Sequence, residues 1–364
     1  MPHDRRFIAR DEAKAPFFVG IDLGGTTVKT GVVDDLGRPL CWHQIPTEVA
    51  RGPEDAARRM GEAVQKAIGD AGLPLAEVAR VGLGSPGTLD FRTGVMITPT
   101  NFPGWGGFPI RDRVGHHAGL AVSFANDASA AAYGEFWIGS GRGYHSLVML
   151  TLGTGVGCGI IIGDLILEGE NGHGTECGHL IVDCAKDARR CSCGQTGHLE
   201  SYASANGVIA RAKDAIAAGR PTSLGRRLAG GAALSPLLIA EEAEAGDSLA
   251  LDIVLETGSY LALGIVSLMH TIDPTGVLIG GAMTFGMNES ELGRRFLGHV
   301  RAEVKRRTFP TLAERTLIDY ASLGPDAGFI GAAGIARVDH FKSLRGRAQD
   351  PQAALTPTRS TRAV

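Results

Sequence analysis

Apolar and polar positions follow the same order in two stretches of this chain. The first stretch begins at Phe17 and the second at Leu147. Each contains an apolar strand, a tight turn rich in Gly and Thr, a second apolar strand, a short turn containing Gly and Asp, and a third strand. The tight turns fall at residues 22–26 and 151–155. This repetition predicts two facing hairpins, one in each of two lobes.

The rest of the chain alternates between two hydrophobic patterns. Helical spacing of apolar residues predicts helices at 53–72, 108–117, 128–136, 200–218, 248–270 and 289–307. Short buried apolar runs predict strands at 79–83, 120–125 and 276–282. Strands alternate with helices throughout, so the predicted fold class is α/β, with a mixed sheet flanked by helices in each lobe.

Length and composition are those of a globular protein with two cores. The chain has 364 residues, of which 44% are apolar, and such a length typically corresponds to two domains of about 150 residues each. The net charge of −3 gives no basic excess, so a nucleic-acid partner is not expected. No apolar run approaches the roughly 20 residues that span a bilayer, and residues 1–16 lack an apolar signal core. We therefore expect no membrane association and a cytoplasmic location.

The two tight turns suit a phosphate chain. Glycine lets backbone N–H groups approach phosphate oxygens closely, and threonine hydroxyls add hydrogen-bond donors. Taken alone, the glycines of the second turn are equally compatible with a plain hairpin or with a dinucleotide-binding loop. A β-like run at 158–162 follows them where a dinucleotide-binding loop would open a helix. The paired turns therefore favour phosphate binding between two lobes.

Two carboxylates lie next to these elements. Asp127 follows the predicted strand at 120–125 and precedes a helix, a position where α/β sheets hold their ligands. The simpler alternative is that Asn126 or Asp127 only caps that helix. Asp22 either stabilises the first turn or holds Mg²⁺ through water beside bound phosphates.

Cysteines and histidines cluster after the second repeat. Four of the six cysteines lie within residues 177–193, and disulfides are disfavoured in a large cytoplasmic chain. Two thiols and two imidazoles can fill all four coordination positions of Zn²⁺, which is typical of a structural zinc site. The predicted ligands are His179, Cys191, Cys193 and His198. The alternatives are free thiols with surface histidines, or replacement of one ligand by Cys177 or Cys184.

In these motifs the chain resembles the ROK family of sugar kinases and sugar-responsive repressors, within the actin-like ATPase superfamily. The resemblance runs from Phe17 to Ala336 and rests on residues 22–26, 84–87, 101–105, 126–128, 153–157, 176–179, 191–200 and 280–281. It implies a two-lobed actin-like ATPase fold, which is ribonuclease H-like, built on the duplicated three-stranded hairpin. The chain departs from the family pattern at His198, where Cys is usual, and at Cys177, where an aliphatic residue is usual.

The resemblance also implies roles for individual residues. Asp127 is implied as the general base. Sugar contacts are implied for Asn101, Asn126, Asp127, Glu176, His179 and Glu200, so His179 would serve both sugar and zinc. ATP and its Mg²⁺ are assigned to Asp22, Gly24, Gly25, Thr26, Thr27, Gly153, Thr154, Gly155, Gly280 and Gly281.

We therefore expect ATP-dependent phosphorylation of glucose at its 6-hydroxyl. The alternatives are a kinase for another hexose or N-acetylhexosamine, and a sugar-sensing repressor, for which little room precedes Phe17 for a DNA-binding module. The expected cofactors are ATP, catalytic Mg²⁺ and structural Zn²⁺, and the resemblance implies a homodimer or higher homo-oligomer. The expected lobes are 17–125, with a helix at about 326–340 packing back on it, and 126–325; residues 341–364 are expected to form a flexible tail.

Overall fold

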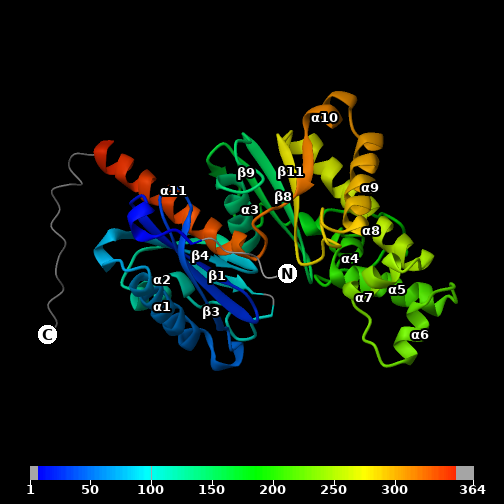
Figure 1. Ribbon diagram of the computed structural model, residues 1–364, viewed down its shortest axis with the longest axis horizontal. Coiled ribbons are helices and arrows are strands. Elements are labelled where there is room, and N and C mark those ends of the chain that lie inside the picture. Colours follow the sequence, from blue (N-terminus) through cyan, green and yellow to red (C-terminus); the bar gives the residue numbers. More distant parts are fainter. Residues whose placement is uncertain (1–6, 100, 350–364) are drawn as a thin grey trace.

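Two five-stranded sheets, one in each lobe, form the framework of the protein (Figure 1). The computed structural model describes residues 7–99 and 101–349. The first sheet has the strand order β3-β2-β1-β4-β7, and the second has the order β10-β9-β8-β11-β12. In both sheets, three antiparallel strands made by successive hairpins continue into two parallel strands. The repeated sequence pattern thus corresponds to a repeated sheet topology, and the α/β fold class is confirmed.

Except for β12, the strands of the two sheets lie where the sequence analysis predicts strands. Those of the first sheet are β1 (Phe17–Leu23), β2 (Thr27–Val33), β3 (Pro39–Pro46), β4 (Val78–Ser85) and β7 (Val122–Asn126). Those of the second sheet are β8 (Ser146–Leu152), β9 (Val156–Ile162), β10 (Leu165–Ile166), β11 (Gly276–Gly281) and β12 (Leu317–Tyr320). A separate hairpin that the sequence analysis did not predict consists of β5 (Thr88–Asp90) and β6 (Val95–Thr98).

Helices flank both sheets. In the first lobe, α1 (Pro53–Asp70) and α2 (Ile110–Ala118) pack against each other, whereas α3 (Asp127–Trp137) packs against β8 and β9 of the second sheet. The second lobe carries α4 (Glu200–Ala203), α5 (Ala205–Ala217), α6 (Leu224–Ala229), α7 (Pro236–Glu244), α8 (Ser248–Ile272), α9 (Glu291–Arg307) and α10 (Pro310–Arg315). The single helix predicted at 200–218 is divided at Ser204, whose backbone is extended and whose hydroxyl caps α5.

Helix α8 lies in the core of the second lobe. Its 25 residues are long and apolar enough to cross a bilayer by length and composition, which corrects the expectation that no apolar run approaches that length. In the protein, 56% of its most apolar stretch is buried, and Leu261 and Ile265 are fully buried against the second sheet and α9. We therefore assign α8 to the protein core.

Helix α11 (Ala327–Gln349) returns from the second lobe and lies across the first sheet (Figure 1). The close approach depends on glycine in two strands. A Cβ at Gly20 of β1 would collide with the Phe329 carbonyl, and a Cβ at Gly82 of β4 would collide with the Ala332 carbonyl. The helix runs to Gln349, so residues 341–349 are helical rather than part of a flexible tail. The rest of the expected tail, 350–364, lies outside the described residues.

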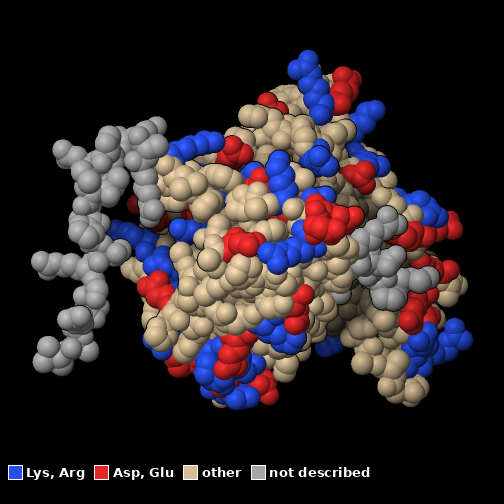
Figure 2. All heavy atoms as spheres, turned by 60° about the vertical axis from the view of Figure 1, so that its left-hand side comes forward, with Lys and Arg blue, Asp and Glu red and all other residues tan. Residues whose placement is uncertain are grey.

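Charged side chains of both signs are interspersed on the face of the molecule drawn in Figure 2. On α1, charged residues form pairs one helical turn apart, such as Lys66 with Asp70 at 2.5 Å and Arg58 with Glu62 at 2.5 Å. Exposed pairs of this kind contribute little to stability. The mixed pattern on this face agrees with the small net charge of −3.

Candidate active site

The first tight turn joins β1 to β2 and leaves its tip open to solvent. The Gly24 N–H donates to the Thr27 carbonyl (3.0 Å), while residues 25–26 are exposed. Asp22 lies opposite Lys29 in the hairpin, and Lys29 Nζ donates to Asp22 Oδ2 (3.3 Å). Burial raises the pKa of Asp22, and Lys29 opposes that rise. The turn therefore presents an exposed tip beside a carboxylate that is paired with a cation.

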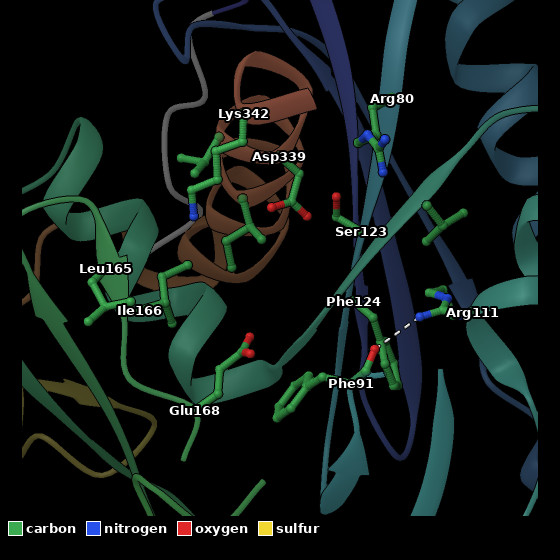
Figure 3. A pocket seen from close by; sticks show the side chains of 13 residues that line it. Arg80, Phe91, Arg111, Ser123, Phe124, Leu165, Ile166, Glu168, Asp339 and Lys342 are labelled. Atoms are coloured by element: carbon green, nitrogen blue, oxygen red, sulfur yellow. Dashed lines mark hydrogen bonds between the residues drawn. The ribbon is translucent and has the colours of Figure 1, made fainter. Parts of the chain in front are cut away.

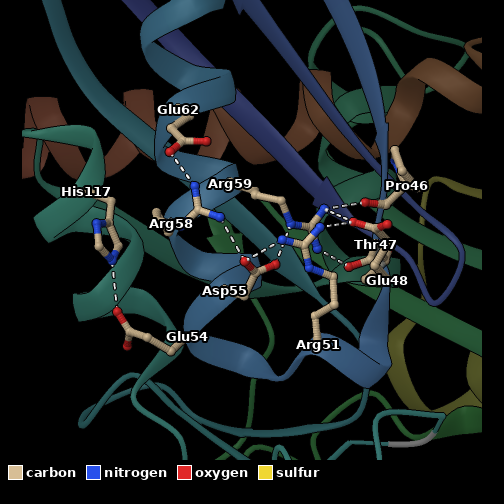
Figure 4. Close-up of polar contacts among 10 residues, drawn as sticks. All are labelled: Pro46, Thr47, Glu48, Arg51, Glu54, Asp55, Arg58, Arg59, Glu62 and His117. Atoms are coloured by element: carbon tan, nitrogen blue, oxygen red, sulfur yellow. Dashed lines mark hydrogen bonds and ion pairs between the residues drawn. The ribbon is translucent and has the colours of Figure 1, made fainter.

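A hydrogen-bond network behind this turn holds it in place (Figure 4). Thr47 follows β3 and donates its hydroxyl to the Gly24 carbonyl (2.6 Å). Arg59 of α1 donates to the carbonyls of Pro46 (2.6 Å) and Thr47. Asp55, one helical turn earlier, pairs with Arg59 Nε at 2.7 Å and fixes the guanidinium. These bonds connect α1 to the first tight turn through Thr47.

The loop after β6 brings an asparagine beside the same turn. Asn101 is exposed and has a backbone φ of 68°, and a Cβ on Gly25 would lie 3.9 Å from its Cβ. Phe102 and Trp105 anchor the loop in the first core, with ring centroids 4.8 Å apart. Trp105 Nε1 also donates to the Val49 carbonyl (3.2 Å). The Asn101 side chain is thus held near the tip of the first turn.

Asn126 caps helix α3, which leaves the Asp127 carboxylate available for chemistry. Asn126 Oδ1 accepts hydrogen bonds from the N–H groups of Ala128 (2.9 Å) and Ser129 (3.3 Å). Asp127 Oδ1 shares the Ala128 N–H at 2.8 Å. Within the described residues, no hydrogen bond reaches Asp127 Oδ2. Of the two alternatives for the cap, the structure therefore selects Asn126.

Two carboxylates that are distant in sequence, those of Asp22 and Glu176, act on the carboxylate of Asp127. Burial, followed by the nearby carboxylates of Asp22 and Glu176, raises the pKa of Asp127 to about 6 against the opposing bond from the Ala128 N–H. Asp22 lies near the end of β1, Asp127 begins α3, and Glu176 precedes the short helix η4 (Cys177–His179). A carboxylate with such a pKa is ionised at neutral pH and is more basic than an ordinary aspartate, as a general base requires.

The second tight turn joins β8 to β9. The Gly153 N–H donates to the Gly155 carbonyl (3.0 Å), and Thr154 is exposed at the tip. Glu200, the first residue of α4, accepts from the Val156 N–H just after the turn (3.1 Å). A Cβ at Gly155 would collide with the Glu200 carboxylate. Any larger residue at this position would therefore displace the Glu200 carboxylate.

Gly280 and Gly281 end β11 alongside the second turn. In the parallel register they pair with Thr151 and Leu152, the residues immediately before the turn. Gly281 has a φ of 93°, and a Cβ there would collide with the backbone of Leu152. The two strands therefore approach each other closely where the second turn begins.

His179, Cys191, Cys193 and His198 form a four-ligand cluster, with all ligand atoms within 4.8 Å of one another. The two Nδ1 atoms are 3.1 Å apart, His179 Nδ1 lies 3.6 Å from Cys191 Sγ, and His198 Nδ1 lies 3.3 Å from Cys193 Sγ. A tetrahedral ion with zinc bonds of about 2.0–2.1 Å to nitrogen and about 2.3 Å to sulfur requires ligand separations of roughly 3.3–3.8 Å. The donor set and its spacing therefore fit Zn²⁺.

The other cysteines of this segment lie outside the cluster. Cys177 is buried beside Cys158 of β9, and burial together with Cys177 raises the pKa of the Cys158 thiol. Cys184 is exposed. Within the described part of the chain, neither Cys177 nor Cys184 belongs to the four-ligand group. The geometry thus favours His198 over both replacement ligands.

Two residues connect the cluster to the rest of the site. His179 directs Nδ1 toward the cluster, and its Nε2 lies 3.9 Å from Glu176 Oε2. Glu200, which accepts from the second turn, also accepts from the Ser192 hydroxyl of the cysteine loop (2.8 Å). The cluster therefore contacts both the carboxylate group around Asp127 and the second turn.

Sequence reasoning missed three residues that support this geometry. Lys29 was foreseeable, because the predicted hairpin register places it opposite Asp22. The sequence contains no such indication for Arg59 or Ser192. Arg59 donates to backbone carbonyls and Ser192 donates to the Glu200 carboxylate, and only the tertiary fold brings these partners near.

Comparison with known proteins identifies the family to which this geometry belongs. The sequence model of the ROK family matches residues 18–338. The chain belongs to the ROK family. A glucokinase from Halalkalibacterium halodurans is 31% identical over 330 residues, which cover 91% of this chain and 98% of that protein.

Two solved ROK structures share the fold. The ROK hexokinase from Thermus thermophilus is 32% identical with a TM-score of 0.75, covering 90% of this chain and 99% of that one. A ROK glucokinase from Streptomyces griseus, in complex with glucose and AMPPNP, is 32% identical with a TM-score of 0.69, covering 88% of this chain and 99% of that one. This ROK chain therefore has the two-lobed actin-like ATPase fold.

Proposed function

We propose that this ROK protein is a glucokinase, which transfers the γ-phosphoryl group of ATP to the 6-hydroxyl of glucose. The observation that carries the proposal is the Asp127 carboxylate. Asn126 caps helix α3, so Asp127 does not have to, and the pKa of Asp127 is raised to about 6. Glucokinases and hexokinases among its relatives support the choice of substrate and phosphoryl donor.

Asp127 acts as the general base. It accepts the proton of the sugar 6-hydroxyl while that oxygen forms a bond to the γ-phosphorus, and the bond from the γ-phosphorus to the bridging oxygen breaks to leave ADP. Positioned general bases typically contribute ~10²–10⁴ in rate. Nearby negative charge and burial hold the pKa of Asp127 close to the working pH, so the proton is taken up during the reaction and released afterwards.

The two tight turns hold the phosphates of ATP. Their exposed tips offer backbone N–H groups and the hydroxyls of Thr26, Thr27 and Thr154. Asp22 is the carboxylate suited to hold Mg²⁺ through water, and that ion would neutralise phosphate charge. Gly280 and Gly281 have no side chains to obstruct the adenosine.

Sugar hydroxyls contact Asn101, Asn126, Glu176 and His179. Asn126 Oδ1 is committed to the helix cap, so the amide contacts sugar through Nδ2, whose present bond to the Gly87 carbonyl is long at 3.4 Å. Both oxygens of Glu200 already accept hydrogen bonds, so this residue contacts sugar through its remaining lone pairs.

A structural Zn²⁺ held by His179, Cys191, Cys193 and His198 would organise the cysteine loop. Four protein ligands leave no open coordination position for catalysis. Because His179 would bind the metal through Nδ1, its Nε2 stays available on the side of Glu176. This arrangement supports a dual role for His179 in metal and sugar binding.

An assay across a panel of sugars tests the proposal. Release of ADP is coupled to NADH oxidation with ATP and glucose, mannose, galactose, fructose, N-acetylglucosamine or N-acetylmannosamine. We expect kcat/KM for glucose to exceed that of every other sugar at least tenfold. A higher value for another sugar would reassign the substrate, and absence of sugar-dependent ADP release would reject the kinase activity.

We also propose that the enzyme is a cytoplasmic homodimer or higher homo-oligomer, as its resemblance to the family implies. Light scattering during size-exclusion chromatography tests the assembly. A mass equal to that of one 38.0 kDa chain would reject it.

A further inference from the structure

A cavity, separate from the residues assigned above, opens where the two lobes meet α11 (Figure 3). Its volume is about 500 Å³, which is in the usual range of small-molecule sites. The first lobe contributes Arg80 of β4, Ser123 of β7 and Phe91, the second lobe contributes Glu168, and α11 contributes Asp339 and Lys342. None of the residues assigned to sugar, phosphate or metal lines this cavity.

Several polar groups facing this cavity have no partner among the described residues. Ser123 is only 3% exposed, and its hydroxyl makes no hydrogen bond. Arg80 Nε is buried and equally unpaired. In the view of Figure 3, Ser123 lies between Arg80 and Asp339. Unpaired buried polar groups are rare in folded proteins, because each one costs free energy unless water or a ligand satisfies it.

The two carboxylates of the cavity, Glu168 and Asp339, also lack a cationic partner among the described residues, and the charge of Asp339 acts on Glu168. Burial, and then the charge of Asp339, raises the pKa of Glu168 to about 7, while Lys342 opposes the rise. Glu168 is therefore partly protonated near neutral pH and is able both to donate and to accept a hydrogen bond. Neither carboxylate forms an ion pair within the described part of the chain.

The lining offers cations for an anionic group and polar partners for hydroxyls. Arg80 and Lys342 form no ion pair with any other described residue and suit a phosphate group, which Arg binds through several N–H donors. Asp339, Glu168 and Ser123 suit hydroxyls, and Phe91 offers an apolar face to a sugar ring. Arg111 adds little, because its guanidinium already donates to Asp112 and to the carbonyls of Phe91 and Arg92.

We propose that this cavity is an effector site for a hexose monophosphate. The segment 169–175 links the cavity to the proposed sugar site, because Glu168 precedes that segment and Glu176 follows it. Gly172, midway along the segment, packs against Leu89 of β5, where a Cβ would collide with the carbonyl. A ligand that contacts both lobes and this segment changes the position of the two lobes relative to each other around Asp127.

Calorimetry on the full-length protein tests the site. The proposed catalytic cleft is first saturated with glucose and a non-hydrolysable ATP analogue, and glucose 6-phosphate is then titrated. We expect one saturable site per chain. Inorganic phosphate alone, titrated under the same conditions, should bind at least tenfold more weakly, because it offers only part of the recognised chemistry.

Two variants and a control assign the binding to this cavity. Arg80→Gln should weaken glucose 6-phosphate at least tenfold, and Ser123→Ala should weaken it about three- to tenfold. Arg92→Gln, an exposed arginine next to Phe91, should bind like the unmodified protein. Because the Ser123 hydroxyl has no partner, Ser123→Ala should fold even if Arg80→Gln does not, which equal melting temperatures would verify.

Three results would overturn the proposal. They are the absence of saturable binding, equal binding by the unmodified protein and both cavity variants, and binding of inorganic phosphate as tight as that of the sugar phosphate. Failure of the proposed glucokinase activity is recognised separately in the coupled assay. Glucose 6-phosphate that binds at an unsaturated catalytic cleft would also bind to the Arg80→Gln variant. Only the binding that is lost in Arg80→Gln is therefore attributed to the cavity.

Discussion

Replacement of Asp127 by Asn should abolish turnover while leaving the protein at least as stable as before. Asn is nearly isosteric with Asp, and its carbonyl oxygen still accepts the 2.8 Å bond from the Ala128 N–H. The helix cap does not depend on this residue, because Asn126 supplies it. The substitution therefore removes basicity and charge and leaves the local geometry unchanged.

The expected loss of activity follows from the role of a general base. With a pKa of about 6, about 97% of Asp127 is ionised at pH 7.5, so nearly all of the unmodified enzyme is competent. An amide has no basicity in this range, and loss of a general base typically lowers kcat by ~10²–10⁴. In the unmodified enzyme, kcat/KM should fall as pH drops through about 6, roughly tenfold per pH unit below that value.

Asp127→Asn should lower activity but raise the stability of the fold. The pKa of Asp127 in the folded protein, about 6, is higher than the ordinary 3.8, so folding favours the protonated form. The stability due to this group is present below pH 3.8 and is lost as pH rises through 6. A rise of that size corresponds to about 3 kcal/mol at neutral pH, which solvent screening of this partly exposed residue reduces to about 1–2 kcal/mol. Asp127→Asn removes this destabilisation.

Two measurements on the same preparation check the reasoning. The coupled assay from pH 5 to 9 gives kcat and KM, and a thermal melt at pH 7.5 gives the relative stability. We expect at least a hundredfold loss of kcat together with a melting temperature equal to or above that of the unmodified protein. More than a tenth of the original activity would reject Asp127 as the base, and a melting temperature several degrees lower would show that its charge stabilises the fold.

Four further outcomes are expected. Freshly purified, reduced protein should contain about one Zn²⁺ per chain by elemental analysis, and a metal-free active enzyme would contradict the zinc site. His198→Cys should keep zinc and change KM for glucose less than twofold, because a thiolate is an equivalent ligand; loss of zinc would show that the imidazole geometry is essential. Arg59→Lys should raise KM for ATP about three- to tenfold by losing its bonds behind the first turn, whereas Arg58→Lys, which pairs only with carboxylates, should not. Gly155→Ala should lower kcat/KM at least tenfold, because the new methyl group must displace Glu200; an unchanged value would show that the turn adapts.

The elements predicted from sequence were those with strong local periodicity. The hairpins and the helix at 248–270 have apolar patterns long enough to define their type, and α8 and the two sheets agree with them. The hairpin β5–β6 and the short helix α6 have too few residues for periodicity to distinguish them from loops. Ser204 shows a different limit. One residue with extended backbone ends α4 and caps α5, so a continuous helical pattern conceals two helices.

The candidate site was predictable where residues of one chemistry lie close in sequence. The proposed zinc ligands are the clearest case, since three of the four fall within residues 191–198. The choice between Asn126 and Asp127 as helix cap was not predictable, because both residue types cap helices and only the coordinates show which oxygen accepts the bonds. The raised pKa of Asp127 was equally hidden, because it depends on burial and on carboxylates brought from β1 and the segment before η4.

The two halves of the site repeat the same hairpin but stabilise it differently. The first turn rests on Thr47 and Arg59, which belong to the first lobe alone. The second turn rests on Glu200, which also accepts from Ser192 of the cysteine loop. Through Glu200 that loop reaches the proposed phosphate site, and through His179 it reaches the proposed sugar site at Glu176. Loss of the metal would therefore disturb ATP and glucose binding together, whereas loss of Arg59 would disturb ATP binding alone.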